Sequence, residues 1–556
     1  MAEIAAKVVA QPPSKAPRMR TVVMAASAGT AFEWYDFFIF GSLTLVISKT
    51  FFSGLSDAAG YFAALALFGA GFAFRPLGAL VFGRVGDRLG RKGAFLVTVA
   101  MMGGATFAIG LLPSYAKAGA WAPISLITLR IIQGFALGGE YGGAAIYVAE
   151  HAPSDRRGWL TSWVQASAAF GLFGALSVIW LTRLLAGDAA FAVWGWRIPF
   201  LVSAGLLAIS VWMRMKLDES PSFAKLQQEE TVSKAPLAEA FGRWSNLKLV
   251  LLAFFSMMSA QGAVWYTSFF YIQVFMEKFL KVDPAAINFL MMGAVAASAP
   301  LYVFFGWLSD IVGRKPVMLA GMALGLAAFF PGFHALERAA NPALALASER
   351  TPVVVVADPA DCALQFDPVG KAAFVSSCDI AKSLLANAGV SYANAAAPAG
   401  AAALVKIGDQ IAVPSLSARG APKAQAAAIK AAVEARLKTA LKAAGYPAKA
   451  DPARMDMPAM FGLLMIFVTA ATALFGPLAA CLVELFPTRV RYTALSLPYH
   501  IGTGWVGGFL PFTAFAIVAA TGDIYAGLWY PVAFTLISLL TTAFLLTETR
   551  GRSLDD

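Results

Sequence analysis

Two stretches of ten residues, Gly83–Lys92 (GRVGDRLGRK) and Gly306–Lys315 (GWLSDIVGRK), are partial copies of one another 223 residues apart. Both have glycine at the first position, aspartate at the fifth and Gly-Arg-Lys at the end. Each lies between two long apolar runs, so each is expected to be a tight basic turn that joins two membrane helices. A repeat at this spacing indicates a chain built from two related halves.

A second pair of similar stretches, Glu150–Arg157 and Glu484–Arg491, shares the pattern E-x-x-P-[ST]-x-x-R. Its two members are 334 residues apart, about 111 more than the members of the first pair. The second half therefore contains an insertion, which must lie after Lys315 and before Glu484.

The composition is that of a membrane protein. Hydrophobic residues make up 59% of the chain and charged residues 13%, against roughly 25% charged residues in a typical soluble domain. The mean hydropathy is +0.68. The net charge of +11 is not taken as a sign of nucleic-acid binding, because basic residues of membrane proteins gather in cytoplasmic loops.

Apolar runs long enough to cross a bilayer core of about 30 Å occur twelve times. They lie at 21–48, 59–83, 93–115, 121–150, 158–186, 196–217, 247–279, 285–308, 316–335, 458–483, 494–520 and 526–547. This predicts an all-α polytopic membrane protein with two pseudo-symmetric six-helix bundles. The predicted parts are a tail at 1–20, a first bundle at 21–217, a linker at 218–246, a second bundle at 247–335 and 458–547, an insert at 336–457 and a tail at 548–556.

Lys and Arg are concentrated in the two repeated turns and in the two E-x-x-P loops. The positive-inside rule places these loops, both termini and the central linker in the cytoplasm, and the insert on the other side. The insert contains an apolar run at Val353–Val356, which predicts a strand. Further along, Ile429, Val433, Leu437 and Leu441 recur every four residues, as on one face of a helix. A small extracytoplasmic α/β domain between helices nine and ten is expected.

Two of the three cysteines, Cys362 and Cys378, lie in this insert. A disulfide between them suits an oxidising compartment, and the alternative is two unpaired thiols in a loosely ordered segment. The third cysteine, Cys481, lies in the tenth span and is interpreted as a small packing residue.

Ionisable residues inside membrane spans are costly and therefore mark candidate sites. Glu33 and Asp36 are three residues apart in the first span and share one helical face. Arg130 in the fourth span lies at a similar depth, so a carboxylate and this guanidinium are expected to pair. The pair is either purely structural or a proton-coupling pair, and the sequence does not choose between Glu33 and Asp36 as proton carrier.

Other polar residues are candidates for a central cavity. Arg75 either binds an anionic substrate or extends toward the cytoplasmic loops. His500, among glycines in the eleventh span, is a candidate proton or substrate ligand, or part of a bending helix that gates the path. The remaining candidates line a polar cavity or make ordinary interhelical hydrogen bonds: Gln133, Glu140, Tyr141, Gln165, Gln261 and Tyr266.

Asp87 in the first turn is expected to act as a latch. Its carboxylate can accept hydrogen bonds from helix N-terminal amides or from a basic residue, which would hold the cytoplasmic side shut. The second copy has Ile311 in place of Arg88. Asp310 is expected to act as a latch as well, and Arg314 to belong to the gate, but because of Ile311 the second turn is not expected to be symmetric with the first.

Several motifs together resemble the major facilitator superfamily. They are G-x-x-x-D-R-x-G-R-K at 83–92, its partial copy at 306–315, and R-x-x-Q-G at 130–134. More narrowly, five stretches resemble its metabolite:proton symporter family: F-E-W-Y-D-F at 32–37, F-R-P-L-G at 74–78, G-G-E-Y-G-G at 138–143, W-R-I-P-F at 196–200 and E-L-F-P-T-R-V-R-Y at 484–492. The resemblance does not cover the insert at 336–457.

The resemblance implies substrate uptake by alternating access, driven by the proton gradient. Family substrates include citrate, α-ketoglutarate, shikimate and proline or betaine. By motif match the cytoplasmic gate is formed by Asp87, Arg88, Arg91 and Lys92, and Arg130 lies near the proton site. We expect a bacterial inner-membrane protein that works as a monomer, with no cofactor and no metal.

The prediction is therefore a proton-coupled symporter for a small organic acid or zwitterion. An uncoupled facilitator or an exporter on the same fold is the nearest alternative. A membrane receptor that senses a ligand through the insert is a further alternative. An enzyme is not expected, because HExxH, GxSxG and phosphate-loop motifs do not occur in the sequence.

Overall fold

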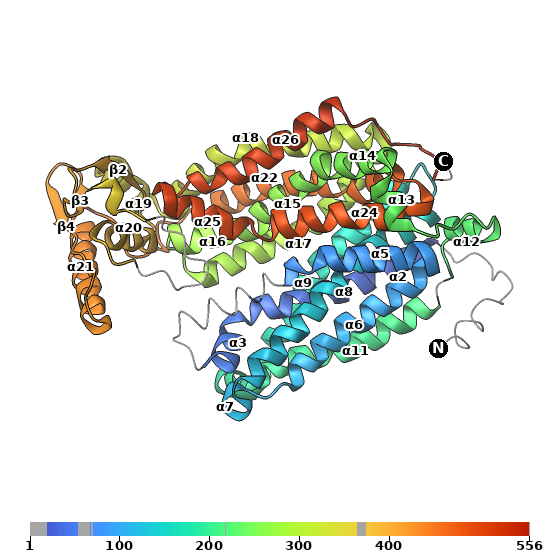
Figure 1. Cartoon of the computed structure of the whole chain (residues 1–556), viewed down its shortest axis with the longest axis horizontal. Coiled ribbons are helices and arrows are strands. Elements are labelled where there is room, and N and C mark those ends of the chain that lie inside the picture. The colour runs from blue at the N-terminus through green and yellow to red at the C-terminus, as the bar shows by residue number, and fades with distance from the viewer. Residues whose placement is uncertain (1–18, 54–66, 68–70, 217, 364–373, 555–556) are drawn as a thin grey trace.

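The computed structural model describes residues 19–53, 67, 71–216, 218–363 and 374–554. Residues 1–18 of the expected N-terminal tail, and most of 59–70 in the expected second span, lie outside the described residues. The described chain is almost entirely helical apart from one small sheet at the left of Figure 1.

The first half forms one bundle, drawn in blue and cyan in the lower part of Figure 1. Its long helices follow the predicted spans closely and are α2 (Met19–Ser42) with α3 (Thr44–Phe51), α5 (Arg75–Leu89), α6 (Arg91–Leu111), α8 (Trp121–His151), α9 (Arg157–Ala186) and α11 (Arg197–Met215). A short helix, α7 (Tyr115–Ala118), precedes α8. Two further helices, α12 (Pro221–Gln228) and α13 (Pro236–Gly242), lie in the predicted central linker.

The second half forms the other bundle, drawn in green to red in Figure 1. A continuous helical stretch at 244–279 includes α14 (Trp244–Ala253), α15 (Ser259–Tyr266) and α16 (Ile272–Val274). The other helices are α17 (Pro284–Val312), α18 (Arg314–Ala340), α22 (Met457–Phe475), α23 (Leu478–Leu485), α24 (Arg491–His500), a wider π-helical turn η7 (Ile501–Gly507), α25 (Leu510–Thr521) and α26 (Trp529–Phe544).

Ten helical stretches of the described chain are long and apolar enough to cross a membrane. The first two predicted spans correspond to α2 with α3 and to the region that ends in α5. The predicted all-α polytopic fold is confirmed.

Each repeated turn is a single glycine between two helices. Gly90 separates α5 from α6 with φ of 115°, and Gly313 separates α17 from α18 with φ of 107°. A positive φ at this tight turn favours glycine over residues with a Cβ. The eighth position of both copies is therefore glycine for a conformational reason.

The insert contains a four-stranded sheet of order β2-β1-β3-β4. Strand β1 (Val353–Ala357) runs parallel to β2 (Tyr392–Ala396) and antiparallel to β3 (Leu404–Ile407), which pairs with β4 (Ile411–Pro414). Three helices accompany the sheet: α19 (Pro342–Arg350), α20 (Ser377–Ala388) and α21 (Lys423–Ala443). The predicted strand and the predicted helix of the insert are both present.

The described contacts fix the insert to the second half. The Tyr392 amide donates to the Gly522 carbonyl at 2.8 Å, between α25 and α26. The Ala450 amide donates to the Lys281 carbonyl at 3.0 Å, before α17.

Cys362 and Cys378 form a disulfide with their Cα atoms 5.2 Å apart. Helix α18 runs to Ala340, so it extends five residues past the predicted boundary at 335.

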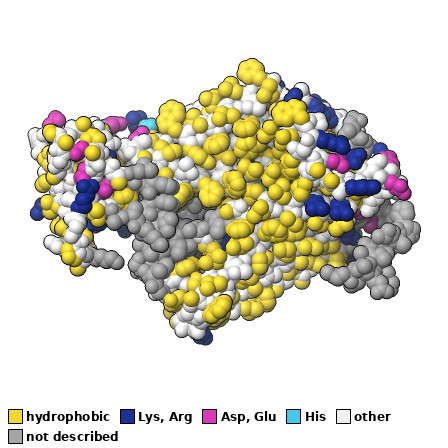
Figure 2. All heavy atoms as spheres, viewed as in Figure 1, with side chains coloured by type: hydrophobic (Ala, Val, Ile, Leu, Met, Phe, Trp, Pro, Cys, Tyr) yellow, Lys and Arg dark blue, Asp and Glu magenta, His cyan; other side chains and the backbone are white. Residues whose placement is uncertain are grey.

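The surface changes along the long axis of the molecule. Hydrophobic side chains cover the middle of the bundles, whereas blue and magenta side chains gather at the two ends (Figure 2). The sheet lies at one end, and α12, α13 and the C-terminus lie at the other (Figure 1). We call these the insert end and the turn end.

Candidate functional site

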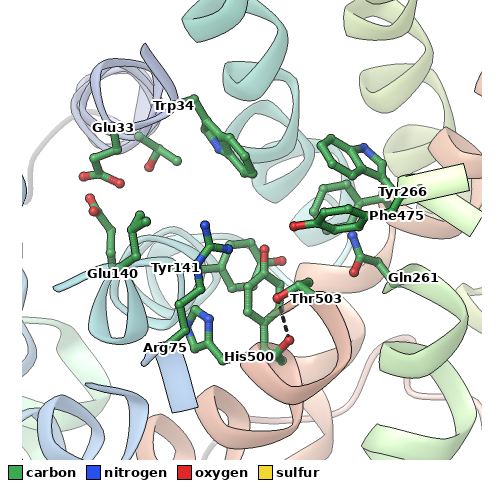
Figure 3. A pocket seen from close by; sticks show the side chains of 14 residues that line it. Glu33, Trp34, Arg75, Glu140, Tyr141, Gln261, Tyr266, Phe475, His500 and Thr503 are labelled. Carbon is green, nitrogen blue, oxygen red and sulfur yellow. Dashed lines mark hydrogen bonds between the residues drawn. The ribbon is translucent and has the colours of Figure 1, made fainter. Parts of the chain in front are cut away.

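A cavity of about 580 Å³, open solvent included, lies between the two bundles. Residues of α2, α5 and α8 line it from the first half, and residues of α15, α22, α24 and η7 line it from the second half. Of the predicted cavity residues, six lie in this lining: Arg75, Glu140, Tyr141, Gln261, Tyr266 and His500 (Figure 3). Glu33 lies there too.

Arg75 and His500 occupy one side of the cavity, beside Tyr141 (Figure 3). Arg75 begins α5 and is 5% exposed, with its guanidinium carbon 4.2 Å from the centre of the Phe72 ring. His500 ends α24 and is 2% exposed, and neither ring nitrogen has a hydrogen-bond partner among the described residues. A buried guanidinium in the lining favours anion binding over extension toward the loops.

Glu33 and Glu140 face one another on the other side (Figure 3). Between them lies Arg214 of α11, whose Nη2 is 2.8 Å from Glu33 Oε1 and 3.2 Å from Glu140 Oε1. The Arg214 guanidinium carbon is 3.6 Å from the centre of the Phe95 ring. The described partner of Glu33 is therefore Arg214, and the expectation that Arg130 fills this role is wrong for Glu33.

The guanidinium of Arg130 donates to Gln133 Oε1 at 2.8 Å and lies 3.8 Å from the centre of the Phe40 ring. Gln133 in turn donates to the Thr106 hydroxyl at 2.7 Å, and this hydroxyl lies beside Asp36. Arg130 and Asp36 thus belong to one polar chain inside the first bundle, outside the described lining of the central cavity.

Asp36 lines a second, smaller space of about 220 Å³, open solvent included, among α2, α6 and α11. Glu33 lines both cavities. The two carboxylates share one helical face, as predicted, yet they have different access to the central cavity because α2 lies between the two spaces.

Aromatic rings surround the rest of the central cavity. Tyr141 of α8 stacks on Tyr499 of α24, with ring centres 3.6 Å apart across the two halves. Gln165 donates to the Tyr141 hydroxyl and thereby orients it. Gln133 and Gln165 act in these interhelical hydrogen bonds rather than in the described lining.

At the turn end, the side chain of Asp87 in the first half accepts hydrogen bonds from the second half. Its two carboxylate oxygens accept from the amides of Tyr492, at 3.1 Å, and Thr493, at 2.7 Å. These amides begin α24, where backbone donors lack partners within the helix and favour a negative charge. This is the geometry of the expected latch.

Asp310 makes the equivalent contact in the opposite direction. It accepts from the amides of Gly158, at 2.8 Å, and Trp159, at 2.7 Å, at the start of α9 in the first half. The second turn therefore has the contact expected of a latch at Asp310. It matches the first turn despite Ile311, because that position takes no part in the contact. Its counterpart Arg88 is exposed, so the structure does not include Arg88 in this contact.

Two clusters of buried ion pairs join the halves beside these aspartates. Glu150 of the first half pairs with Arg91 and with Arg491 of the second half, whose Nη1 is 2.6 Å from Glu150 Oε1. Glu484 of the second half makes the equivalent ion pairs. Its Oε1 is 3.2 Å from Nη2 of Arg314 in the same half and 2.9 Å from Nη1 of Arg157 in the first half.

The segments after the sixth and twelfth spans extend the symmetry. Glu219 accepts from the amides of Arg91 and Lys92 at 3.2 and 3.3 Å. Glu548 accepts from the amides of Arg314 and Lys315 at 2.9 and 3.0 Å. Partial burial opposes the charge of Glu548, but four backbone amides outweigh it and lower the pKa of Glu548 below its ordinary value of 4.5.

The sequence profile of the family "Sugar (and other) transporter" matches residues 21–243 and 439–556, which is more than half of the chain. The matched part covers the first half and the last three helices of the second half, and it leaves out residues 244–438, which contain the first three helices of the second half and most of the insert. The chain belongs to the major facilitator superfamily, in its metabolite:proton symporter family.

Named relatives agree with this membership. The chain is 39% identical to the shikimate transporter of Escherichia coli over 328 residues, which cover 58% of this chain and 73% of the relative. It is 34% identical to the proline/betaine transporter of Salmonella typhimurium over 326 residues, which cover 57% of this chain and 64% of that relative. The match thus spans slightly less than two thirds of the proline/betaine transporter.

Solved structures show the same fold. The proton:xylose symporter XylE, bound to 6-bromo-6-deoxy-D-glucose, superposes with a TM-score of 0.62 over 97% of this chain and 98% of XylE. The identity is 16%, so the likeness concerns the fold alone. The chain is a membrane transporter and not an enzyme.

Sequence reasoning missed several residues of this transporter. Arg214 lies three residues before the predicted end of the sixth span, so it was not counted as an intramembrane charge. The roles of Glu150, Glu484, Arg157 and Arg491 were also missed, although all four belong to the repeated E-x-x-P-[ST]-x-x-R pattern. That repeat was the signal, because the same charges recur at the same place in both halves.

Within the described part of the transporter, no group of three or more His, Cys, Asp and Glu side chains is arranged to hold a metal ion.

Proposed function

We propose that this transporter takes up a small carboxylate or zwitterionic metabolite together with protons, by alternating access. The observation that carries the proposal is the polarity of the central cavity. A buried guanidinium, Arg75, lies on one side, and the Glu33–Arg214–Glu140 cluster lies on the other. The first side fits a substrate carboxylate and the second fits proton binding.

The charge of the acidic cluster supports proton coupling. Two carboxylates face one guanidinium, so the cluster carries one negative charge when both carboxylates are ionised. A buried net charge is costly, and one bound proton removes it. Glu33 is the proposed proton carrier in preference to Asp36, because Glu33 lines the central cavity and Asp36 lines the smaller one.

The proposed orientation places the turn end in the cytoplasm and the insert in the periplasm of a bacterium. The basic turns and the positive-inside rule support this orientation. The protein then lies in the inner membrane and works as a monomer, with both bundles and the cavity supplied by one chain. The named relatives support shikimate-like carboxylates and betaine-like zwitterions as the first substrates to test.

The test is uptake into proteoliposomes of radiolabelled shikimate and glycine betaine, with and without an inward proton gradient. Wild-type protein is expected to accumulate one of them only while the gradient lasts. Accumulation that ignores collapse of the gradient would contradict symport and favour an uncoupled facilitator.

Glu33→Gln and Asp36→Asn form a matched pair of variants for the carrier. Both remove one buried carboxylate of α2. Glu33→Gln is expected to retain exchange of external for internal substrate and to lose gradient-driven accumulation, whereas Asp36→Asn keeps both. The reverse pattern would assign the proton to Asp36.

A further inference from the structure

Tyr492 is a residue of the second half that is enclosed by the first half. It is the second residue of α24 and is fully buried. Its side chain packs so closely against three glycines that a Cβ on any of them would press against it: Gly86 of α5, and Gly142 and Gly143 of α8. A Cβ on Gly142 would lie 2.8 Å from ring carbon Cε2, and one on Gly143 would lie 2.9 Å from the hydroxyl oxygen. The three glycines therefore form a slot for this ring.

The hydroxyl of Tyr492 reaches the neighbourhood of the acidic cluster. It donates to the carbonyl of Gly139, the residue before Glu140. Four charged groups of the first half interact with Tyr492: Asp87, Glu33, Arg91 and Arg214. The ring thus stands between the Glu33–Arg214–Glu140 cluster and the ion pairs of the turn end.

The backbone of Tyr492 belongs to the latch. Its amide is one of the two donors to Asp87, at 3.1 Å. When the halves separate at the turn end, this hydrogen bond must break and α24 must move away from α5 and α8. The ring leaves its slot in the same movement, because amide and ring belong to one residue.

One carboxylate oxygen of the cluster is available to bind a proton. Glu140 Oε2 has no hydrogen-bond partner among the described residues, and neither do Arg214 Nε and Nη1. A side chain on Gly29 of α2 would meet the Arg214 guanidinium, with Cζ and Nε both at 2.8 Å. The close approach of α2 at Gly29 therefore holds Arg214 between the two carboxylates.

We propose that the buried Tyr492 ring separates the protonated Glu33–Arg214–Glu140 cluster from the cytoplasm. Water reaches the cluster only when the turn end opens and the ring leaves its slot. The direction of proton release, toward the cytoplasm, rests on the proposed symport. The role of the ring as a barrier to water does not. Proton release to the cytoplasm is then tied to gate opening by one residue. Tyr492 is a positioning residue, since it touches the cluster's surroundings and not the substrate.

The test measures proton leak without any substrate. Purified variants are reconstituted in vesicles that contain a pH-sensitive dye, and a membrane potential drives protons inward. Tyr492→Ala empties the slot and is expected to let the vesicle interior acidify faster than with wild type. Tyr492→Phe keeps the ring and is expected to stay at the wild-type rate. Equal rates for Tyr492→Ala and wild type would overturn the proposal.

Two further variants keep the test decisive if Tyr492→Ala is unstable. Gly142→Ala brings a methyl group to 2.8 Å from ring carbon Cε2 of Tyr492 and to 2.6 Å from Ser496 Oγ, so the ring must shift, and the variant is expected to leak as well. Its matched control is Gly104→Ala on α6, where a Cβ would meet nothing within 4 Å. Leak through both or through neither of these glycine variants refutes the slot.

A double variant identifies the path of the leak. Combining Glu33→Gln with the leaking variant is expected to abolish the leak, because the proton has lost its carrier. A leak that persists would show that the path bypasses the cluster. Failure of symport is recognised separately, as substrate uptake by wild type that ignores the proton gradient.

Discussion

Asp87→Asn isolates the energy that holds the turn end shut. In the closed state both oxygens of Asp87 accept backbone amides of the opposite half, at 2.7 and 3.1 Å. Asparagine keeps one acceptor oxygen, so the variant loses one hydrogen bond and the charge. Hydrogen bonds to charged groups contribute about 1.5–3 kcal/mol, and a carboxylate at a helix N-terminus adds about 0.3–1 kcal/mol at the surface.

A loss of about 2 kcal/mol raises the ratio of open to closed protein roughly 30-fold, at 1.4 kcal/mol for each factor of ten. The loss acts on this ratio because the contact joins the two halves and exists only while they are together. A ligand-free conformational assay is therefore expected to show the whole effect.

Cys481 offers such an assay without an added label. It is fully buried in α23, which packs against α8 and α9 of the other half. The other two cysteines are joined to each other. Alkylation of Cys481 by N-ethylmaleimide, followed by intact mass, is expected to report opening, and the rate should rise roughly 30-fold in Asp87→Asn if opening limits access.

The controls come from the same two turns. Asp310→Asn removes the equivalent contact to α9 and is expected to accelerate alkylation to a similar degree. Arg88→Ala changes the residue next to Asp87, but the Arg88 side chain is exposed. The alkylation rate of this variant should therefore match wild type. An unchanged rate in Asp87→Asn, or an equal increase in Arg88→Ala, would refute the assignment of the latch.

Two further predictions concern the insert and the C-terminal segment. Replacing Cys362 and Cys378 by serine opens a loop with a sequence separation of 16, and in the chain-entropy model this costs about 3 kcal/mol of stability. The variant is expected to have a lower melting temperature, which reductant no longer changes. An unchanged melting temperature would contradict this prediction. Because the pKa of Glu548 is lowered in the folded state, its contribution is full above the ordinary value of 4.5 and is lost as the pH falls below it. Protease resistance of the C-terminal segment should therefore be constant from pH 8 to 5 in wild type and lower throughout in Glu548→Gln.

The sequence by itself determined the elements and their order. Apolar runs, glycine turns and helical periodicity are local properties, so the spans, the strand at Val353–Ala357 and the helix at Lys423–Ala443 could be predicted. The unequal spacing of two repeats also located the insert. These inferences needed no knowledge of which helices touch.

Only the tertiary structure decided the partners of the charges. Counting residues gives the depth of Glu33 and Arg130 in the membrane but not the rotation of each helix about its axis, and rotation brought Arg214 to Glu33 instead. In the same way, the sequence indicated that Asp87 accepts either from helix N-terminal amides or from a basic residue, and only the structure gave the partners as the first amides of α24 in the other half. Depth follows from a local count along one helix, whereas pairing depends on how all the helices pack, and for that reason the gate and the acidic cluster emerged only in three dimensions.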